Sequence, residues 1–190
     1  AGTIYFRGNE RGPDEAARDV GHAASRALAL ALPDVYHRYD EAAVRVTARD
    51  IDAVLKSESL LGLTPVFAQL GLVHDQGGKP VINTESGPLA EVLGHIAHRS
   101  SMYELPTGKH LAEVFGREPF GWELDTMRLL TLALLRAGRI EVTSQGQVIE
   151  SALTVEAANV FGNNTVFRHA SFRPRTTDCE FKDLLDAGEA

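Results

Sequence analysis

Along this chain, apolar residues at helical spacing alternate with short β-branched runs that end in glycine-containing turns. The helical spacing is clearest over residues 14–32 and 122–137, where Ala and Leu dominate. Strand-like runs that turn at a glycine occur over residues 71–83 and 138–150, as in β-hairpins. Residues 164–174 are expected to be strand-like or extended. The pattern therefore predicts a mostly helical α+β protein.

The N-terminal region is predicted to be a strand over residues 2–6 followed by the helix over residues 14–32. Pro33 is expected just beyond the helix end, because proline cannot continue a helix interior. Thr47 and Asp50 have the spacing of a capping box that opens another helix. We expect the first helix to face a core through Ala17, Val20, Ala24, Ala27, Leu28 and Ala31.

Two segments show the same order of features. In each, a helix ends at a glycine, Gly71 or Gly138, and a strand, a polar turn and a returning strand follow. This order is the second half of a winged-helix unit, in which a β-ribbon follows the last helix of a helix-turn-helix. We therefore predict winged-helix-like units, two in tandem. The expected divisions are residues 1–100 with the first unit, residues 101–177 with the second, and an acidic tail over residues 178–190.

The single tryptophan lies in a turn between two predicted helices. Pro119 and Gly121 are typical of a tight turn, and Trp122 follows at the start of the long apolar helix. We expect its ring to be buried against the preceding helix, over residues 109–115. These three residues are therefore assigned a structural role, as the hinge of the second unit.

Charge limits the binding functions that this fold suggests. The net charge is −7, whereas a nucleic-acid footprint needs clustered Lys and Arg. The helix that would enter a DNA groove, over residues 122–137, is apolar almost all round. Both units are therefore expected to pack against other protein, with direct DNA binding as the alternative. The candidate contacts to DNA or a partner are Arg136, Arg139, Arg168, His169, Arg173 and Arg175.

We identify no complete catalytic motif. Residues 106–111 ("PTGKHL") resemble the end of a phosphate-binding loop, but that motif requires Gly where Tyr103 stands and Ser or Thr where His110 stands. The sole cysteine, Cys179, excludes an internal disulfide framework and a Cys-based zinc cluster. We therefore predict no catalytic residue and no cofactor for this chain.

One helix face carries the candidate metal ligands. Glu91, His95 and His98 are spaced to lie on the same side of a predicted helix. A structural zinc site needs four ligands, and no fourth is evident in the sequence. A polar surface face is therefore the expected role, and no metal is predicted.

The turn at residues 119–122 also carries a family resemblance. An acidic residue, a long apolar helix and the sequence Ala137-Gly138-Arg139-Ile140 follow it. Together with residues 2–8, 32–42, 47–55 and 107–118, this region resembles an inner part of the large P-loop ATPases of the BREX and Pgl bacteriophage-exclusion systems, over most of residues 2–150.

The resemblance implies that the intact protein is an ATPase that acts with a DNA methyltransferase and other defence components. ATP would then be bound outside these residues, which lack the phosphate-binding motif. They would form a non-catalytic module that positions other domains of the parent chain, phage-defence proteins or DNA. A winged-helix DNA-binding regulator is the alternative function.

The sequence also predicts the cellular location. No apolar run approaches the roughly 20 residues of a membrane helix, and the first residues lack the pattern of a signal peptide. We therefore expect a cytoplasmic protein with no membrane partner. A start at Ala1 instead of methionine suggests a fragment of a longer chain.

Overall fold

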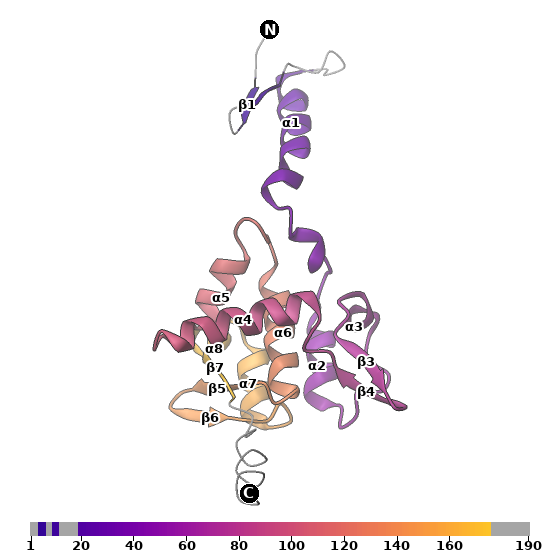
Figure 1. The fold of residues 1–190 in the computed structure, drawn as a ribbon, viewed down its shortest axis with the longest axis vertical. Coiled ribbons are helices and arrows are strands. Elements are labelled where there is room, and N and C mark those ends of the chain that lie inside the picture. Colours follow the sequence, from indigo (N-terminus) through magenta and orange to yellow (C-terminus); the bar gives the residue numbers. More distant parts are fainter. Residues whose placement is uncertain (1–3, 7–8, 12–18, 176–190) are drawn as a thin grey trace, which may run out of the picture.

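The fold is given by a computed structural model that describes residues 4–6, 9–11 and 19–175 (Figure 1). The strands of this part form small antiparallel sheets and the rest is mainly helical, so the predicted α+β class is confirmed. Cys179 and the predicted acidic tail lie outside the described residues. The elements are β1 (Ile4–Phe6), β2 (Asn9–Arg11), α1 (Val20–Val35), the 3-10 helix η1 (Tyr39–Glu41), α2 (Ala48–Lys56), α3 (Pro65–Gln69), β3 (Val73–Gln76), β4 (Lys79–Ile82), α4 (Gly87–Ser101), α5 (Gly108–Phe115), α6 (Leu124–Arg136), β5 (Ile140–Ser144), β6 (Gln147–Ile149), α7 (Val155–Gly162), α8 (Asn164–His169) and β7 (Ser171–Pro174).

The second predicted winged-helix unit is present. Helices α5 and α6 form its helix-turn-helix, and the hairpin β5–β6 follows as the wing. Strand β7 pairs antiparallel with the other edge of β5, which gives the strand order β6-β5-β7. This third strand returns the chain to the end of α6.

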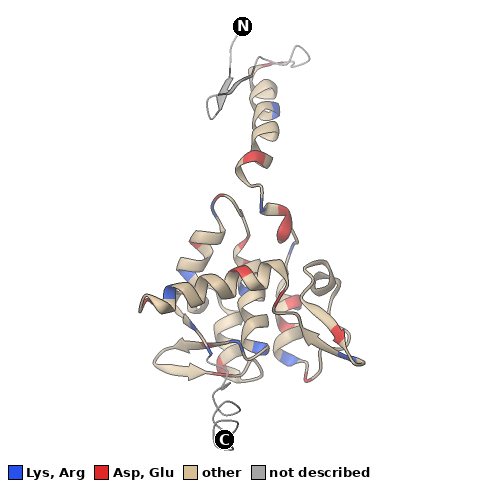
Figure 2. Cartoon of the chain, in the orientation of Figure 1, with Lys and Arg blue, Asp and Glu red and all other residues tan. Residues whose placement is uncertain are grey.

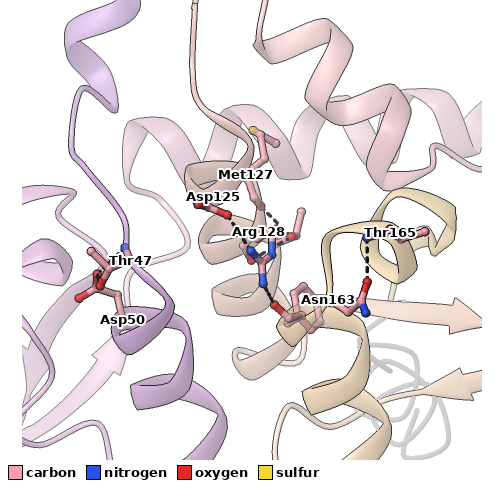
Figure 3. A network of polar contacts seen from close by, with 9 residues as sticks. Thr47, Asp50, Asp125, Met127, Arg128, Asn163 and Thr165 are labelled. Carbon is pink, nitrogen blue, oxygen red and sulfur yellow. Dashed lines mark hydrogen bonds and ion pairs between the residues drawn. The ribbon is translucent and has the colours of Figure 1, made fainter.

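The expectation of an extended segment over residues 164–174 is wrong for its first half. That half forms α8, because the Asn163 side chain caps the helix by accepting hydrogen bonds from the backbone N–H groups of Thr165 and Val166. Figure 3 shows the bond to Thr165. Phe167 of α8 is fully buried, so packing also favours the helix.

The first unit repeats the order of the second, with α2, α3 and the hairpin β3–β4. Its predicted capping box is confirmed, since the Asp50 carboxylate accepts hydrogen bonds from the backbone N–H and the hydroxyl of Thr47 (Figure 3). Asp50 also accepts the Thr64 hydroxyl at 2.6 Å, which ties the start of α3 to the start of α2. Gly71 and Gly138 end the corresponding helices with φ of 62° and 67°, a conformation that glycine adopts readily.

Both units contribute to one core. Its buried side chains run from Ala42, before α2, to Phe172 on β7. Helix α2 packs against α6 and α7, while α4 packs against α6 and β7. Helix α6 therefore lies at the centre of the body and joins the two units.

Helix α1 projects away from this body (Figure 1). The predicted core face on it is wrong. Val20, Ala24 and Leu28 are exposed, Ala27 is partly exposed, Ala31 is buried, and Ala17 lies outside the described residues. Apolar periodicity identified a helix correctly, but most of the apolar side chains of this helix remain exposed in the structure.

The expected end of the first helix before Pro33 is also wrong. Pro33 lies inside α1, which continues to Val35. Pro33 has no N–H to donate within the helix, and the turn after it closes where the backbone N–H of Tyr36 donates to the Leu32 carbonyl at 2.8 Å. The chain then bends toward the body through η1.

Candidate interaction surface

Helix α6, which would read DNA in a winged-helix protein, has no exposed central face. Every residue of it from 126 to 135 is buried. Helices α2, α4 and α5 pack around it, together with β5. A helix enters the major groove only with an accessible side, so α6 is not available for that role.

The polar side chains of α6 are used inside the molecule. Arg128 is 7% exposed and donates hydrogen bonds to Asp125 Oδ1, at 2.7 Å, and to the backbone carbonyl of Phe161 at the end of α7. Figure 3 shows the Arg128 guanidinium beside the Asp125 carboxylate. Thr131 donates its hydroxyl hydrogen to the Met127 carbonyl at 2.7 Å. The bond to Phe161 fastens α6 to α7, the other two bonds lie within α6, and little polar surface is left to recognise an external ligand.

Half of the six candidate basic contacts already have protein partners. Arg136 donates to the carbonyl oxygens of Ser57 and Glu58, at 2.8 and 2.7 Å, just beyond the end of α2. Arg173 forms an ion pair with Glu141, and Arg175 forms one with Glu150 at 3.4 Å.

The remaining candidates, Arg139, Arg168 and His169, are exposed and have no carboxylate partner in the described part of the chain. In Figure 2, Lys and Arg residues are distributed over several elements, with Asp and Glu residues between them. The structure therefore does not gather the predicted contacts into one basic face.

The turn at residues 117–122 anchors the segment that follows α1. Trp122 is 3% exposed, which confirms its predicted burial, and its ring stacks on Phe115 of α5 with centroids 5.2 Å apart. Its indole Nε1–H donates to the Arg38 carbonyl at 3.2 Å. The Arg38 backbone N–H in turn donates to the Pro119 carbonyl at 3.1 Å. The turn and the segment after α1 thus exchange two hydrogen bonds.

Side chains strengthen this anchor. The Arg38 guanidinium lies over the Phe120 ring, 4.5 Å from its centroid, and bonds to Glu91 of α4 at 2.9 Å. Gly121 has φ of 68° and lies against the Tyr36 ring, where a Cβ atom would come within 2.8 Å of Tyr36 Cδ1. The turn is therefore the place where the body holds the base of α1.

Sequence reasoning missed the residues on the α1 side of this anchor. Tyr36 and Arg38 lie in a segment with no local signal for a contact with the turn, and Arg38 is 84 positions from Trp122. No periodicity or local spacing links residues so far apart. The only sequence signal for the anchor was in the turn itself. Its Pro and Gly indicated a fixed conformation, but not that the segment after α1 packs against it.

The exposed surface of α1 is apolar on several sides. Leu28, Leu30 and Leu32 are exposed by 62%, 61% and 49% of their surface. At the base of the helix lies a groove of about 750 Å³, with Leu32, Tyr36 and Gly121 among its lining residues. Single exposed apolar residues are ordinary, but several on one projecting helix indicate an interaction site.

The candidate metal ligands are not brought together. Glu91 pairs with Arg38, and His95 Nε2 lies 3.1 Å from Nε2 of His110 on α5. His98 is exposed on the same helix. Within residues 4–6, 9–11 and 19–175, no group of three or more His, Cys, Asp or Glu side chains is placed to hold a metal ion.

The segment that resembles a phosphate-binding loop is packed against protein. The backbone N–H of Gly108, at the start of α5, donates to the Ala170 carbonyl at 2.9 Å. A Cβ atom on Gly108 would lie 2.1 Å from the Phe167 carbonyl oxygen. Close contact with the end of α8 therefore explains the glycine.

Comparison with known proteins identifies part of the chain. Residues 76–167 match the family model of the winged helix-turn-helix domain of the BREX ATP-binding protein BrxC. The match covers β4 through most of α8, including the anchoring turn, and it confirms the predicted winged-helix fold and the resemblance to a BREX ATPase. Neither a search of curated proteins nor a search of solved structures gives a match. In the described residues, no helix has both the length and the apolar character that crossing a membrane requires.

Proposed function

We propose that this winged helix-turn-helix region is a non-catalytic interaction module of a BREX-type ATPase, and that other protein covers α1. The exposed apolar surface of α1 is the observation that carries the proposal. A helix that is apolar on several sides is stable in water only when other protein buries it. The burial of α6 supports the same function, because it removes the DNA-reading surface of a winged helix.

The anchor beneath α1 gives the module its positioning role. Contacts of the turn with Tyr36 and Arg38 fix the direction in which the helix leaves the body. A partner bound to α1 is therefore held at a set place relative to the winged helix. The partners we propose are other domains of the parent chain and phage-defence proteins in the cytoplasm, with ATP bound elsewhere in the parent.

Site-specific photo-crosslinking in the intact parent protein tests this function. A photoreactive residue replaces Leu28 on α1 in one variant and Val155 on α7 in the control, since both are exposed apolar positions. We expect Leu28 to form a discrete crosslink to a defence protein or to another domain of the parent. Equal crosslinking at both positions, or none at Leu28, would contradict the proposal.

DNA binding is the second candidate. The exposed side chains of Arg139 and Arg168, which have no carboxylate partner among the described residues, favour it. Fluorescence anisotropy with duplex DNA at low and high salt separates the two functions, because phosphate contacts weaken steeply as salt rises. We expect no salt-dependent binding. Binding that is lost in an Arg139→Ala/Arg168→Ala variant would favour the DNA-binding function instead.

A further inference from the structure

A second groove lies between the first hairpin and the end of α6. It has a volume of about 710 Å³. Leu60 and Leu61, in the loop after α2, and residues 80–82 of β4 give it apolar walls. Leu61 is 69% exposed, so apolar surface is available for a ligand.

The rim of this groove is basic. Three basic residues line it, Lys79, Arg136 and Arg139, and Glu58 supplies the single carboxylate. The lining therefore has a net charge of +2. Arg136 bonds to carbonyl oxygens, which do not neutralise its charge. Lys79 and Arg139 are exposed and have no carboxylate partner within the described residues. An acidic ligand therefore has favourable electrostatics here.

The chain leaves its described part at the same rim. The backbone N–H of Arg175 donates to the carbonyl of Arg139 at 2.8 Å. The Arg175 side chain also pairs with Glu150 at 3.4 Å. Residues 176–190 thus start next to a lining residue of the groove. Six residues of extended chain reach at most about 20 Å, so Phe181 can lie up to that distance from Arg139.

The sequence of residues 176–190 has the complementary chemistry. Phe181, Leu184 and Leu185 are spaced i, i+3 and i+4, the spacing of apolar anchors in segments that bind hydrophobic grooves. The same segment has five acidic residues and one basic residue: Asp178, Glu180, Asp183, Asp186 and Glu189, and Lys182. This segment therefore combines apolar anchors with a net charge of −4, one minus five.

We propose that residues 178–190 bind in this groove, with Phe181, Leu184 and Leu185 against its apolar walls. Their carboxylates then lie near Lys79, Arg136 and Arg139. This inference is independent of the function proposed for α1.

Cys179 provides the test, because it is the only cysteine of the chain. A nitroxide attached to Cys179 of the full chain broadens the NMR signals of amides close to it. We expect broadening at Leu60, Leu61 and Val81, and none at Tyr36 or Gly121, which line the other groove. Raising the salt concentration reduces the broadening, since the charges are exposed to solvent.

Charge reversal supplies the controls. Lys79→Glu/Arg139→Glu is expected to abolish the broadening, whereas Arg168→Glu makes the same change on α8, away from the groove, and leaves it intact. Broadening at another surface, or unchanged broadening in the double variant, overturns the proposal. A mixture of nitroxide-labelled chains and isotope-enriched chains without nitroxide shows whether the contact is within one chain. A contact within one chain gives no broadening in this mixture, whereas broadening would overturn the proposal in favour of a contact with a second copy.

A measurement without the label guards against interference by the nitroxide. In the unmodified chain, Leu184→Asp/Leu185→Asp is expected to shift the amide signals of Leu60, Leu61 and Val81. The amides of α5 stay unchanged and serve as an internal reference. Absence of any shift in the groove contradicts the proposal.

Discussion

Trp122 is held in place by ring packing and by a hydrogen bond. Its ring stacks on Phe115 and contacts Phe120, while its Nε1–H bonds to the carbonyl of Arg38. The ring packs the start of α6 against α5, and the bond connects α6 to the base of α1. One side chain thus stabilises both the core and the anchor.

Substitution of Trp122 separates these two contributions. Trp122→Ala removes the buried ring and is expected to lower the free energy of unfolding by about 3–5 kcal/mol. Trp122→Phe keeps an aromatic ring on Phe115 but loses the bond to Arg38, with a smaller expected loss. Urea unfolding followed by circular dichroism measures both variants. An alanine variant with an unchanged midpoint would show that the packing contributes little.

His95 makes the stability depend on pH. Its pKa is lowered by burial, then by the positive charges of His110, Arg99 and His98, against the opposite effect of Glu91. The His95 ring packs against His110 and Phe115 of α5. A lowered histidine pKa means that the folded state favours the neutral ring. The contribution to stability is therefore complete above the unfolded pKa of about 6.5 and is lost as the pH falls toward the folded pKa.

We expect the free energy of unfolding to decrease between pH 7.5 and pH 5, and the decrease to be smaller in His95→Gln. Denaturant unfolding at both pH values gives the comparison. His22→Gln is the control, since His22 is exposed on α1. If His95→Gln shows the same decrease as the parent chain, protonation of His95 is not the cause.

At the scale of elements, the signals that predicted the fold correctly are local. The cap formed by Thr47 and Asp50, the two hairpins and the burial of Trp122 each depend on residues a few positions apart. The surroundings of a helix are not local. Helix α1 and helix α6 have similar apolar sequences, yet α1 is exposed and α6 is buried on all sides. The sequence therefore predicted the helices and the burial of Trp122, but not the projecting α1 or its anchor.

Gly121 is expected to control how α1 attaches to the body. Gly121→Ala forces a side chain into a left-handed conformation, which costs about 1–2 kcal/mol, and its Cβ atom collides with Tyr36. We expect faster hydrogen exchange at the Arg38 amide, which loses its bond to the Pro119 carbonyl, and unchanged exchange in α6.

Gly78→Ala is the matched control for this prediction. Gly78 has φ of 83° but no atom within 4 Å of a Cβ position, so it carries the backbone strain without the collision. Exchange at Arg38 is expected to stay unchanged in that variant. An equal effect of both substitutions would mean that contact with Tyr36 does not hold the anchor.

At the scale of the whole molecule, the shared core predicts that both units unfold together. Ile51 of α2 is 2% exposed in the first unit, and α2 packs on α6, the helix that begins next to Trp122 in the second. Ile51→Ala is expected to lower the free energy of unfolding by about 2–5 kcal/mol. In a single cooperative transition, Trp122 fluorescence and circular dichroism report the same lowered midpoint, although the substitution lies outside the unit that contains the tryptophan. Asp52→Ala, an exposed change on the same helix, is expected to leave that midpoint nearly unchanged. An early transition seen by circular dichroism alone, with the Trp122 midpoint at its original value, would instead mean that the two units unfold as separate domains.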